Sequence, residues 1–272
     1  MITSSIVFYK TDLAMAKTII GCADKSCIEH IYVIDNSPTD ALRERVSSLS
    51  PKVEYIYGQG NVGYGSGHNI GIRKGMELGA KYHIVLNPDI RFEAGTIEKL
   101  TDYADMKPEI GALMPLLTSE DGSINNPMLL IPTPFDIFGR RLLPKSLMKK
   151  RSDQIEMNNV DFSEARNVPQ LSGCFMFMRM DVLKEVGLFD ERFFMYFEDF
   201  DLERRIHKVS KTVVYPSAKV VHLGASEHRT NKKLLKISIQ SAIKYYNKWG
   251  WIFDSDRRKW NKEAFEDGSI MK

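Results

Sequence analysis

The stretch Tyr82-His83-Ile84-Val85-Leu86-Asn87-Pro88-Asp89 predicts a short buried strand that ends in a turn carrying a carboxylate. It belongs to a first half in which strand-like and helix-like segments alternate along the chain. The expected strands cover residues 4–9, 31–34, 53–57, 82–86 and 110–115, and the expected helices cover residues 12–22, 39–49, 69–78 and 96–106. This alternation predicts the α/β fold class, with a mostly parallel central sheet flanked by helices.

The second half is expected to be less regular. Four prolines interrupt residues 127–144, and a basic run, Lys149-Lys150-Arg151, follows them. Long irregular segments inside compact domains usually have a function or are mobile. We therefore expect residues 127–144 to be an irregular segment that is functional or mobile. Beyond it, the pattern predicts strands over residues 171–179, 212–215 and 219–221, and helices over residues 180–186, 199–209 and 231–249.

The composition is that of an ordinary soluble globular protein, with 43% apolar and 27% charged residues in a chain of 272. The net charge of +3 is too small to indicate a nucleic-acid partner, and no nucleic-acid-binding motif accompanies it. The longest apolar runs fall short of the roughly 20 residues that a membrane helix needs, and the N-terminus lacks a signal-peptide pattern. The three cysteines, Cys22, Cys27 and Cys174, lack metal-site spacing, which predicts reduced thiols and a cytoplasmic location.

Polar or glycine-rich segments follow several of the expected strands. Asp35 ends the second strand, and a glycine-rich run over residues 60–71 follows the third. Together with Asp89 they lie at the carboxyl edge of the sheet, where open α/β sheets bind ligands. Asp35 can accept hydrogen bonds from a nucleotide, or it can form an Asx-turn or cap before the next helix. The glycine run suits a phosphate but matches neither a dinucleotide fingerprint nor a P-loop, and a flexible connection is the alternative.

A divalent metal site is one interpretation of Asn87-Pro88-Asp89. Mg²⁺ and Mn²⁺ favour oxygen ligands and are often held by one or two carboxylates plus substrate phosphates, so Asp89 can suffice as an anchor. The alternative is a simple turn, because proline and aspartate both favour turns. His222, directly after Val220-Val221, is either a metal ligand, a phosphate donor or a structural histidine.

Three acids, Glu198, Asp199 and Asp201, stand within four positions behind the aromatic run that begins at Phe193. Carboxylates are costly beside so much apolar surface unless they are paired, solvated or functional. The pattern therefore indicates a general base at the mouth of a pocket. The alternative is the acidic first turn of a helix, in which Asp201 and Arg205 lie one turn apart and pair.

The order of these motifs along the chain is more specific than any one of them. In sequence they are Val33-Ile34-Asp35-Asn36-Ser37, Asn61-Val62-Gly63-Tyr64-Gly65 with Asn69-Ile70-Gly71, Leu86-Asn87-Pro88-Asp89, Ser172-Gly173-Cys174-Phe175, and Gly187-Leu188-Phe189-Asp190-Glu191 running into the acids. Between Ser4 and Ser226 the chain resembles the family 2 glycosyltransferases, enzymes of the GT-A fold, and most closely their rhamnosyltransferase-like branch.

The resemblance implies a role for each group. Asp199 would be the catalytic base with Glu198 as its neighbour, and Asp89 would bind Mg²⁺ or Mn²⁺ with His222 completing the metal site. The nucleotide sugar would be bound by residues that follow the strand ends: Tyr9, Lys10, Asp35, Asn61, Gly63, Tyr64, Asn69, Asn87 and Gly173. The family often carries threonine-tyrosine-asparagine after its first strand, whereas this chain has Phe8-Tyr9-Lys10, whose lysine can reach a phosphate.

The resemblance also implies an activity. We expect an inverting glycosyltransferase that moves L-rhamnose from dTDP-L-rhamnose, or a sugar from a UDP-sugar, onto a glycan acceptor. The acceptor would be lipid-linked and used for bacterial cell-surface polysaccharide, such as O-antigen, capsule or wall glycan. A non-catalytic sugar-nucleotide-binding relative is the alternative outside enzymes.

The expected domain organisation follows the same resemblance. Residues 1–228 would form the GT-A domain, with a nucleotide-sugar half over 1–115 and an acceptor half over 116–228, and residues 229–272 a C-terminal helical extension. The basic and apolar helix in that extension can lie on an anionic membrane, which would give peripheral association at the inner face of the plasma membrane. Packing on the core with a solvated basic face is the alternative.

Overall fold

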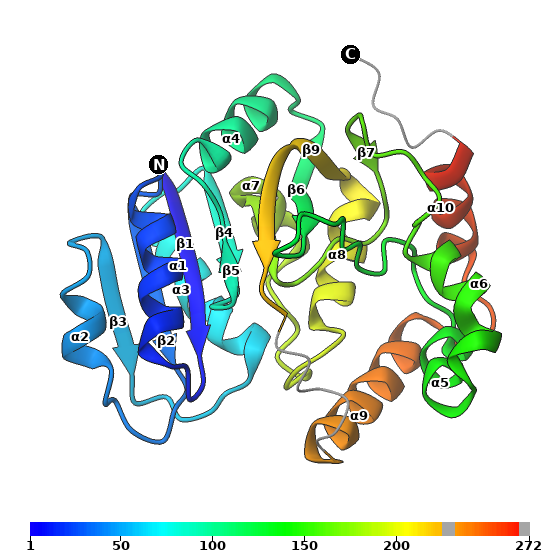
Figure 1. Ribbon diagram of the computed structural model, residues 1–272, viewed down its shortest axis with the longest axis horizontal. Coiled ribbons are helices and arrows are strands. Elements are labelled where there is room, and N and C mark those ends of the chain that lie inside the picture. Colours follow the sequence, from blue (N-terminus) through cyan, green and yellow to red (C-terminus); the bar gives the residue numbers. More distant parts are fainter. Residues whose placement is uncertain (225–231, 267–272) are drawn as a thin grey trace.

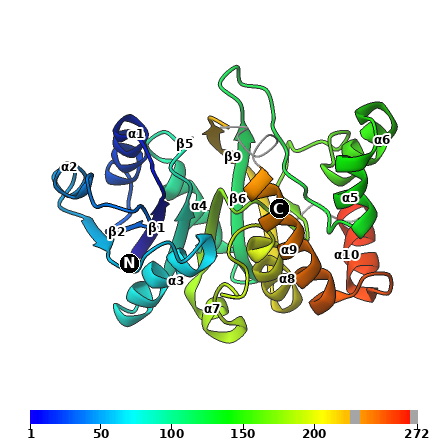
Figure 2. The same cartoon turned by 90° about the horizontal axis from the view of Figure 1, so that it is seen from below.

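A nine-stranded sheet runs through the molecule, and helices pack on both its faces (Figures 1 and 2). The structure is a computed structural model that describes residues 1–224 and 232–266. The strand order is β3-β2-β1-β4-β8-β6-β9-β5, with β7 paired to β9 outside this path. The α/β class expected from the alternating segments is confirmed.

The first half of the sheet is parallel, as predicted. Its strands are β1 (Ile2–Phe8), β2 (His30–Asp35), β3 (Val53–Tyr57) and β4 (Tyr82–Leu86). The helices between them are α1 (Leu13–Asp24), α2 (Arg43–Ser47) and α3 (Tyr64–Glu77). Because these strands are parallel, their carboxyl ends meet at one edge of the sheet, at the bottom of Figure 1.

The glycine-rich run differs from expectation, because most of it lies inside a helix. α3 begins at Tyr64, five residues before the predicted start, and Gly63 precedes it with φ of 92°. A Cβ at Gly67 would stand 2.8 Å from the Val7 side chain, and one at Gly71 would stand 2.7 Å from Ser5 Cβ. These glycines let α3 pack closely on β1, so helix-to-sheet packing explains them better than a phosphate loop does.

The second half makes the complete sheet mixed. It contains β5 (Ile90–Arg91), β6 (Ile110–Thr118), β7 (Arg166–Asn167), β8 (Phe175–Arg179) and β9 (Lys211–His222). β8 is antiparallel to both β4 and β6, and β9 is parallel to β6. The two strands expected near residues 212–221 are one continuous strand with an irregular register. Its helices are α4 (Thr96–Met106), α7 (Met180–Val186) and α8 (Glu198–Val209).

The prediction of an irregular segment over residues 127–144 is wrong for its second part. α5 (Pro134–Leu142) forms there instead, and α6 (Lys145–Ile155) follows it directly. Pro134 occupies the first turn of α5, where a missing N–H costs no helical hydrogen bond. Thr133 and Asp136 cap that helix reciprocally, so the prolines mark helix boundaries here.

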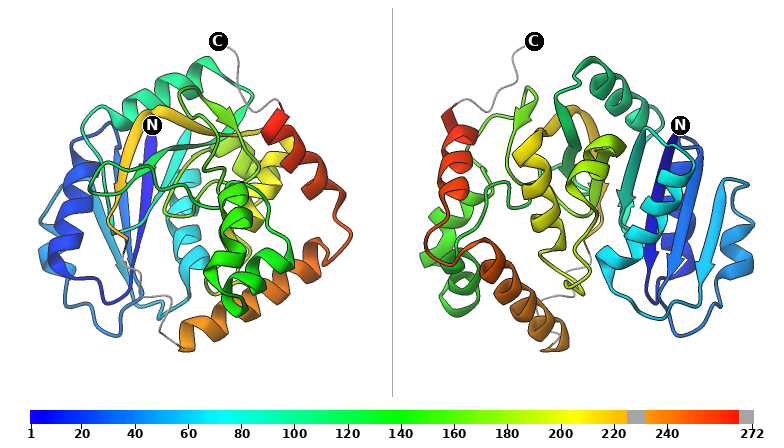
Figure 3. Two further views of the ribbon diagram at one scale, coloured as in Figure 1. Left: turned by 45° about the vertical axis from the view of Figure 1, so that its right-hand side comes forward. Right: turned by 180° about the vertical axis from the view of Figure 1, so that it is seen from behind.

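Two C-terminal helices, α9 (Lys232–Trp249) and α10 (Ser255–Glu266), pack beside α8, α5 and α6 (Figure 3). α9 contributes Tyr245 and Tyr246 to a second apolar core that includes Phe193 and Phe197. Asp254, which precedes α10, binds both terminal nitrogens of the buried Arg204 at 2.8 and 2.9 Å. One face of α9 therefore packs on the domain, as the core-packing alternative requires. The expected domain boundary at residue 228 lies outside the described residues.

Asp201 anchors these helices. Its buried carboxylate accepts hydrogen bonds from Arg205 at 3.0 Å and Trp249 at 2.8 Å, and it forms an ion pair with Lys248 at 2.7 Å. The expected pair with Arg205 thus exists, as a buried support beneath the first turn of α8. Among the described helices, none has the length and apolar character needed to cross a membrane.

Candidate active site

The end of β4 and the end of β9 bring Asp89 and His222 together. Asp89 directly precedes the two-residue strand β5, and His222 is the last residue of the long strand β9. The two strands pair with Ile90 opposite His222, and Leu223 N–H donates to the Asp89 carbonyl at 2.9 Å. As a result, Asp89 Oδ2 lies 3.2 Å from His222 Nε2, and both side chains are partly exposed. Two residues that the sequence separates by half the chain therefore meet, as the metal-site interpretation requires.

The pair fits a divalent cation that receives its remaining ligands from substrate. Within residues 1–224 and 232–266, no group of three His, Cys, Asp or Glu side chains converges on a metal position. One carboxylate and one imidazole would leave most positions of a six-coordinate ion open. Mg²⁺ and Mn²⁺ commonly fill such positions with water and phosphate oxygens. The donor set thus suits an ion bound together with a diphosphate.

Tyr64 joins the edge that carries Asp89 and His222 to the second half of the site. Its hydroxyl shares its proton between the Gly173 carbonyl at 2.5 Å and Asn87 Oδ1 at 2.9 Å. Burial, reinforced by the charge of Glu198, raises the pKa of the Tyr64 phenol well above its usual value. Tyr64 therefore stays protonated and acts as a fixed donor between the loop of Asn87 and the loop of Gly173.

Asp199 lies on the far side of Gly173, in the first turn of α8. Gly173 N–H donates to Asp199 Oδ2 at 3.3 Å, and Phe200 N–H donates to Oδ1 at 2.9 Å. Tyr196 and Phe197, just before this turn, both have φ of 69°, a left-handed conformation that costs a non-glycine residue energy. Such strain often occurs at functional sites, and here it sets the direction in which α8 begins.

Two further acids surround Asp199. Glu198 is 3% exposed, and its Oε2 has no hydrogen-bond partner in the described structure. Glu203, one turn further along α8, is fully buried and accepts Leu171 N–H at 3.0 Å. Burial, followed by the charge of Asp199, raises the pKa of both groups well above the usual value. The pKa of Asp199 is also raised, because the effect of burial exceeds that of four backbone hydrogen bonds, which lower it.

Glu203 is the residue that sequence reasoning missed. Its spacing of four from Asp199 places both on one face of a helix, and that spacing was visible in the sequence. Its burial was not visible, because its contact with Leu171 joins residues 32 positions apart in the chain.

The residues expected at the nucleotide end lie along the carboxyl edge of β1 to β3. Asp35 is 1% exposed; it accepts a hydrogen bond from the Tyr55 hydroxyl and another from Ser37 N–H at 2.8 Å. The Asx-turn alternative is thus correct, and a nucleotide would have to share this carboxylate. Tyr9 and Lys10 are exposed, and the lysine ammonium lies 5.6 Å from the tyrosine ring.

Asn61 and Gly63 form the turn before α3, where Asn61 Oδ1 accepts Gly63 N–H at 3.2 Å. A Cβ at Gly63 would stand 2.2 Å from the Phe194 carbonyl oxygen, which also accepts Tyr64 N–H at 2.8 Å. Only glycine fits here, because the backbone of the aromatic run passes directly over it. The glycine therefore connects the two halves of the site.

The expected ligand contact from Asn69 is wrong. Its side chain is fully buried, and its amide donates to the Phe189 carbonyl at 2.9 Å and accepts Phe189 N–H at 3.0 Å. Both polar ends are used to hold the loop that leads into the aromatic run. Asn69 positions that loop and does not face a ligand.

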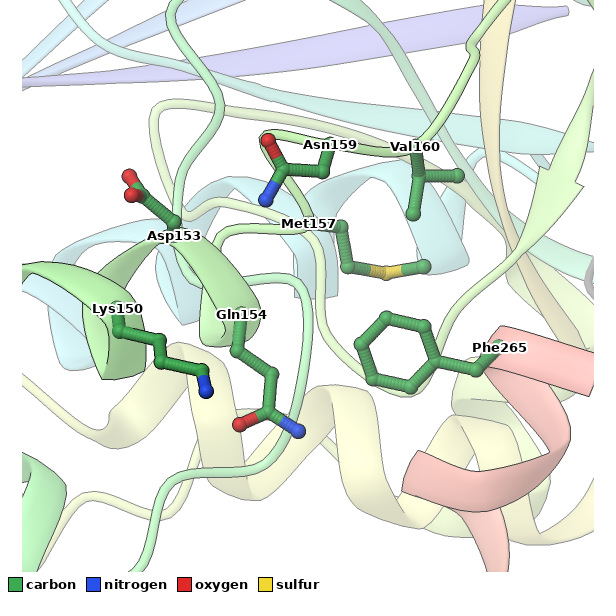
Figure 4. A pocket seen from close by; sticks show the side chains of 7 residues that line it. All are labelled: Lys150, Asp153, Gln154, Met157, Asn159, Val160 and Phe265. Carbon is green, nitrogen blue, oxygen red and sulfur yellow. The ribbon is translucent and has the colours of Figure 1, made fainter.

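A separate hollow of about 350 Å³ lies between α6 and α10 (Figure 4). Its lining residues come from the end of α6, the following loop and the end of α10: Lys150, Asp153, Gln154, Met157, Asn159, Val160 and Phe265. None of the candidate site residues lines it. The chemistry described above belongs to the sheet edge and not to this hollow.

The fold, a mixed sheet with a parallel first half and helices on both faces, is the GT-A fold of glycosyltransferases. Residues 6–187 match the family model described as Glycosyl transferase family 2. The chain belongs to that family, and it is a rhamnosyltransferase-like glycosyltransferase.

The chain is 31% identical over 243 residues to "N-acetylglucosaminyl-diphospho-decaprenol L-rhamnosyltransferase" of Mycobacterium tuberculosis, with 84% of this chain and 75% of that protein covered. It is 24% identical over 225 residues to "Rhamnosyltransferase WbbL" of Escherichia coli K12, with 80% and 82% covered. The fold is also that of a crystal structure of GalNAc-T7 with UDP, GalNAc and Mn²⁺, at a TM-score of 0.66 and 16% identity. That match covers 91% of this chain and 48% of the other.

Replacing Gly173 with Ala should lower the transfer rate about 10- to 100-fold, because small displacements of a reacting group have effects of that size. A Cβ at this position would stand 2.9 Å from Asp199 Oδ2 and 3.2 Å from Asp199 Cβ, so the carboxylate must move. The measurement is the rate of nucleoside diphosphate release at saturating donor and acceptor. Gly21→Ala is the matched control, because no atom lies within 4 Å of its added Cβ. Equal rates for both variants would contradict the assigned position of Asp199.

Proposed function

We propose that this glycosyltransferase moves L-rhamnose from dTDP-L-rhamnose onto a sugar hydroxyl of a lipid-linked glycan, with inversion, during cell-surface polysaccharide synthesis. The name of the mycobacterial relative supports both the sugar and a lipid-diphosphate acceptor. The observation that carries the proposal is the chain of contacts from Asn87 through Tyr64 and Gly173 to Asp199. It joins the Asp89–His222 edge to a carboxylate suited to act as a base.

On the donor side, Asp89 and His222 would hold Mg²⁺ or Mn²⁺ against the diphosphate. When bound, the ion would supply charge neutralisation for the departing nucleoside diphosphate. Lys10 adds an exposed cation at the same edge of the sheet. Asp35, Asn61 and the turn at Gly63 would accommodate the nucleoside beyond it.

On the acceptor side, Asp199 would take the proton of the attacking hydroxyl. The hydroxyl oxygen bonds to the anomeric carbon as the bond from that carbon to the diphosphate oxygen breaks. A glycosidase needs a general acid as well as a base or nucleophile, because its leaving group is a poor one. With Asp89 and His222 holding an ion that would neutralise the charge of the departing diphosphate, no such acid would be needed. Asp199 alone would then serve a single displacement with inversion.

A UDP-sugar is the alternative donor, and it would use the same residues. Ligand binding to the folded state raises thermal stability by about 2.7 kcal/mol at 100 times the dissociation constant. We expect dTDP-L-rhamnose with Mn²⁺ to raise the melting temperature more than UDP-glucose, UDP-N-acetylglucosamine or GDP-mannose with Mn²⁺. We also expect it to release dTDP when a short-chain N-acetylglucosaminyl diphosphate is supplied as acceptor.

The stereochemistry of the product, read by nuclear magnetic resonance, distinguishes inversion from retention. If the protein prefers a UDP-sugar, the proposed donor is wrong but the proposed mechanism is unaffected. A retained anomeric configuration would reject the single displacement.

A further inference from the structure

A patch of exposed apolar side chains surrounds the turn between α5 and α6 and continues onto the loop between α9 and α10. Leu142 is 81% exposed, Leu147 is 70% exposed and Phe253 is 84% exposed. The patch consists of Phe135, Leu142, Leu143, Leu147, Ile252 and Phe253. Side chains of this size are seldom left so exposed side by side without a function.

Helical spacing on α5 and one ring contact connect the two groups of the patch. On α5, residues 135, 138 and 142 follow helical spacing, which places Phe135, Phe138 and Leu142 along one side. Phe138 stacks on Trp251 with ring centroids 6.4 Å apart and planes 8° from parallel. Ile252 and Phe253 follow Trp251 directly, so the second group of the patch adjoins the first. Figures 1 and 2 agree in placing α5, α6, α9 and α10 together on one side of the molecule.

The segment that carries the leucines of the patch is basic. From residue 137 to residue 152 the chain contains no acid, and it contains six basic residues. Two of these, Arg140 and Arg151, pair with Glu156 and Asp136. The exposed lysines at the turn are Lys145, Lys149 and Lys150. Exposed leucines interspersed with exposed lysines suit the surface of an anionic membrane. The acyl chains beneath that surface would take up the leucines, and the lipid phosphates would attract the lysines.

The patch also lies close to the acceptor side of the site. Arg141 donates to Ser238 Oγ of α9 at 2.6 Å, and Ser241, one turn further along α9, donates to the Met195 carbonyl at 2.8 Å. Met195 stands four residues before Asp199. α9 thus spans the short distance from the patch to the loop that positions the candidate base.

The geometry points to this patch as a membrane-docking surface that inserts into anionic phospholipid and holds the active site over a lipid-linked acceptor. The inference rests on the proposed lipid-linked acceptor and adds the surface that recognises its bilayer. It also differs from an anchor on α9 alone, since the leucines that would insert belong to α5 and α6. The leucines and phenylalanine would enter the headgroup region, and the lysines would bind the lipid phosphates.

The test is sedimentation with vesicles of phosphatidylcholine, alone or mixed with phosphatidylglycerol. We expect the full chain to bind the mixed vesicles and to dissociate as salt rises, because exposed charges are screened. Leu142→Ser with Leu147→Ser should weaken binding about tenfold or more. Lys145→Gln with Lys149→Gln should weaken it about fivefold for each lysine. The matched control, Met106→Ser with Lys99→Gln on α4, changes one exposed apolar and one exposed basic side chain away from α5 and should bind normally.

Two measurements separate this inference from the proposed function. Release of dTDP with the short-chain acceptor should be unchanged in the patch variants and impaired only when the acceptor is embedded in vesicles. If the protein binds vesicles through the patch but transfers no sugar, the proposed function is rejected and the patch is still a membrane-docking surface. Failure of the wild-type chain to bind either vesicle, or equal binding by the patch variants and the control, would overturn the inference. A monomer–dimer equilibrium that the leucine variants abolish, without vesicle binding, would assign the patch to a second copy of the chain instead.

Discussion

An Asp199→Asn variant should transfer sugar at least about 1,000 times more slowly than the wild type, while it still binds donor. General base catalysis commonly contributes 100- to 10,000-fold, and asparagine cannot take the acceptor proton. The substitution is nearly isosteric, and its amide oxygen can still accept one of the two backbone hydrogen bonds from Gly173 and Phe200. We therefore expect kcat to fall and the donor-induced rise in melting temperature to persist.

The choice of Asp199 over Glu198 rests on exposure and hydrogen bonding. Asp199 is partly exposed and is fixed by two backbone donors, whereas Glu198 is almost fully buried. Glu198→Gln should accordingly have the smaller effect on kcat. Asp181→Asn, whose side chain is 86% exposed on α7, is the control and should leave the rate unchanged. If Asp199→Asn keeps a kcat near that of the wild type and Glu198→Gln is inactive, the catalytic base is Glu198 and not Asp199.

The expectations that proved correct depend on local patterns. The sequence of residues 82–89 predicts a buried strand followed by an acid, as the structure has it. The strands β3 and β4 and the helices α4 and α7 have the predicted bounds. The parallel order of the first four strands follows from their alternation with helices. The ordered motifs also led to the correct family, which no single motif could have established.

The expectations that failed depend on long-range contacts. Asn69 carries no local sign that Phe189, 120 residues away, would use both ends of its amide. The glycines at 67 and 71 suggest a loop until β1 is seen packed against them. By contrast, the approach of Asp89 to His222 agrees with the expectation, which rested on the family resemblance. The pairing of β5 with β9 that brings them together could not be recognised from the sequence, because β5 has only two residues.

Replacing Asp89 with Ala should lower kcat/KM by at least about a hundredfold, because a metal at a developing charge contributes several kcal/mol to transition-state stability. Asp89 is the carboxylate of the proposed metal pair and the stronger ligand for Mg²⁺ or Mn²⁺. His222→Ala removes the imidazole and should cause a smaller loss. Chelation of divalent ions in the wild type should reproduce the Asp89→Ala rate, and added Mn²⁺ should restore the wild type only.

Stability data separate a metal defect from a folding defect in these variants. The Asp89 carbonyl, not its side chain, accepts Leu223 N–H, so the pairing of β5 with β9 should survive loss of the carboxylate. Without ligands, Asp89→Ala should therefore melt near the wild-type temperature. With dTDP present, Mn²⁺ should stabilise the wild type and have little effect on the variant. If the variant keeps both its rate and its response to Mn²⁺, the ion binds elsewhere, and Asp89 has only the turn-forming role that its proline neighbour suggests.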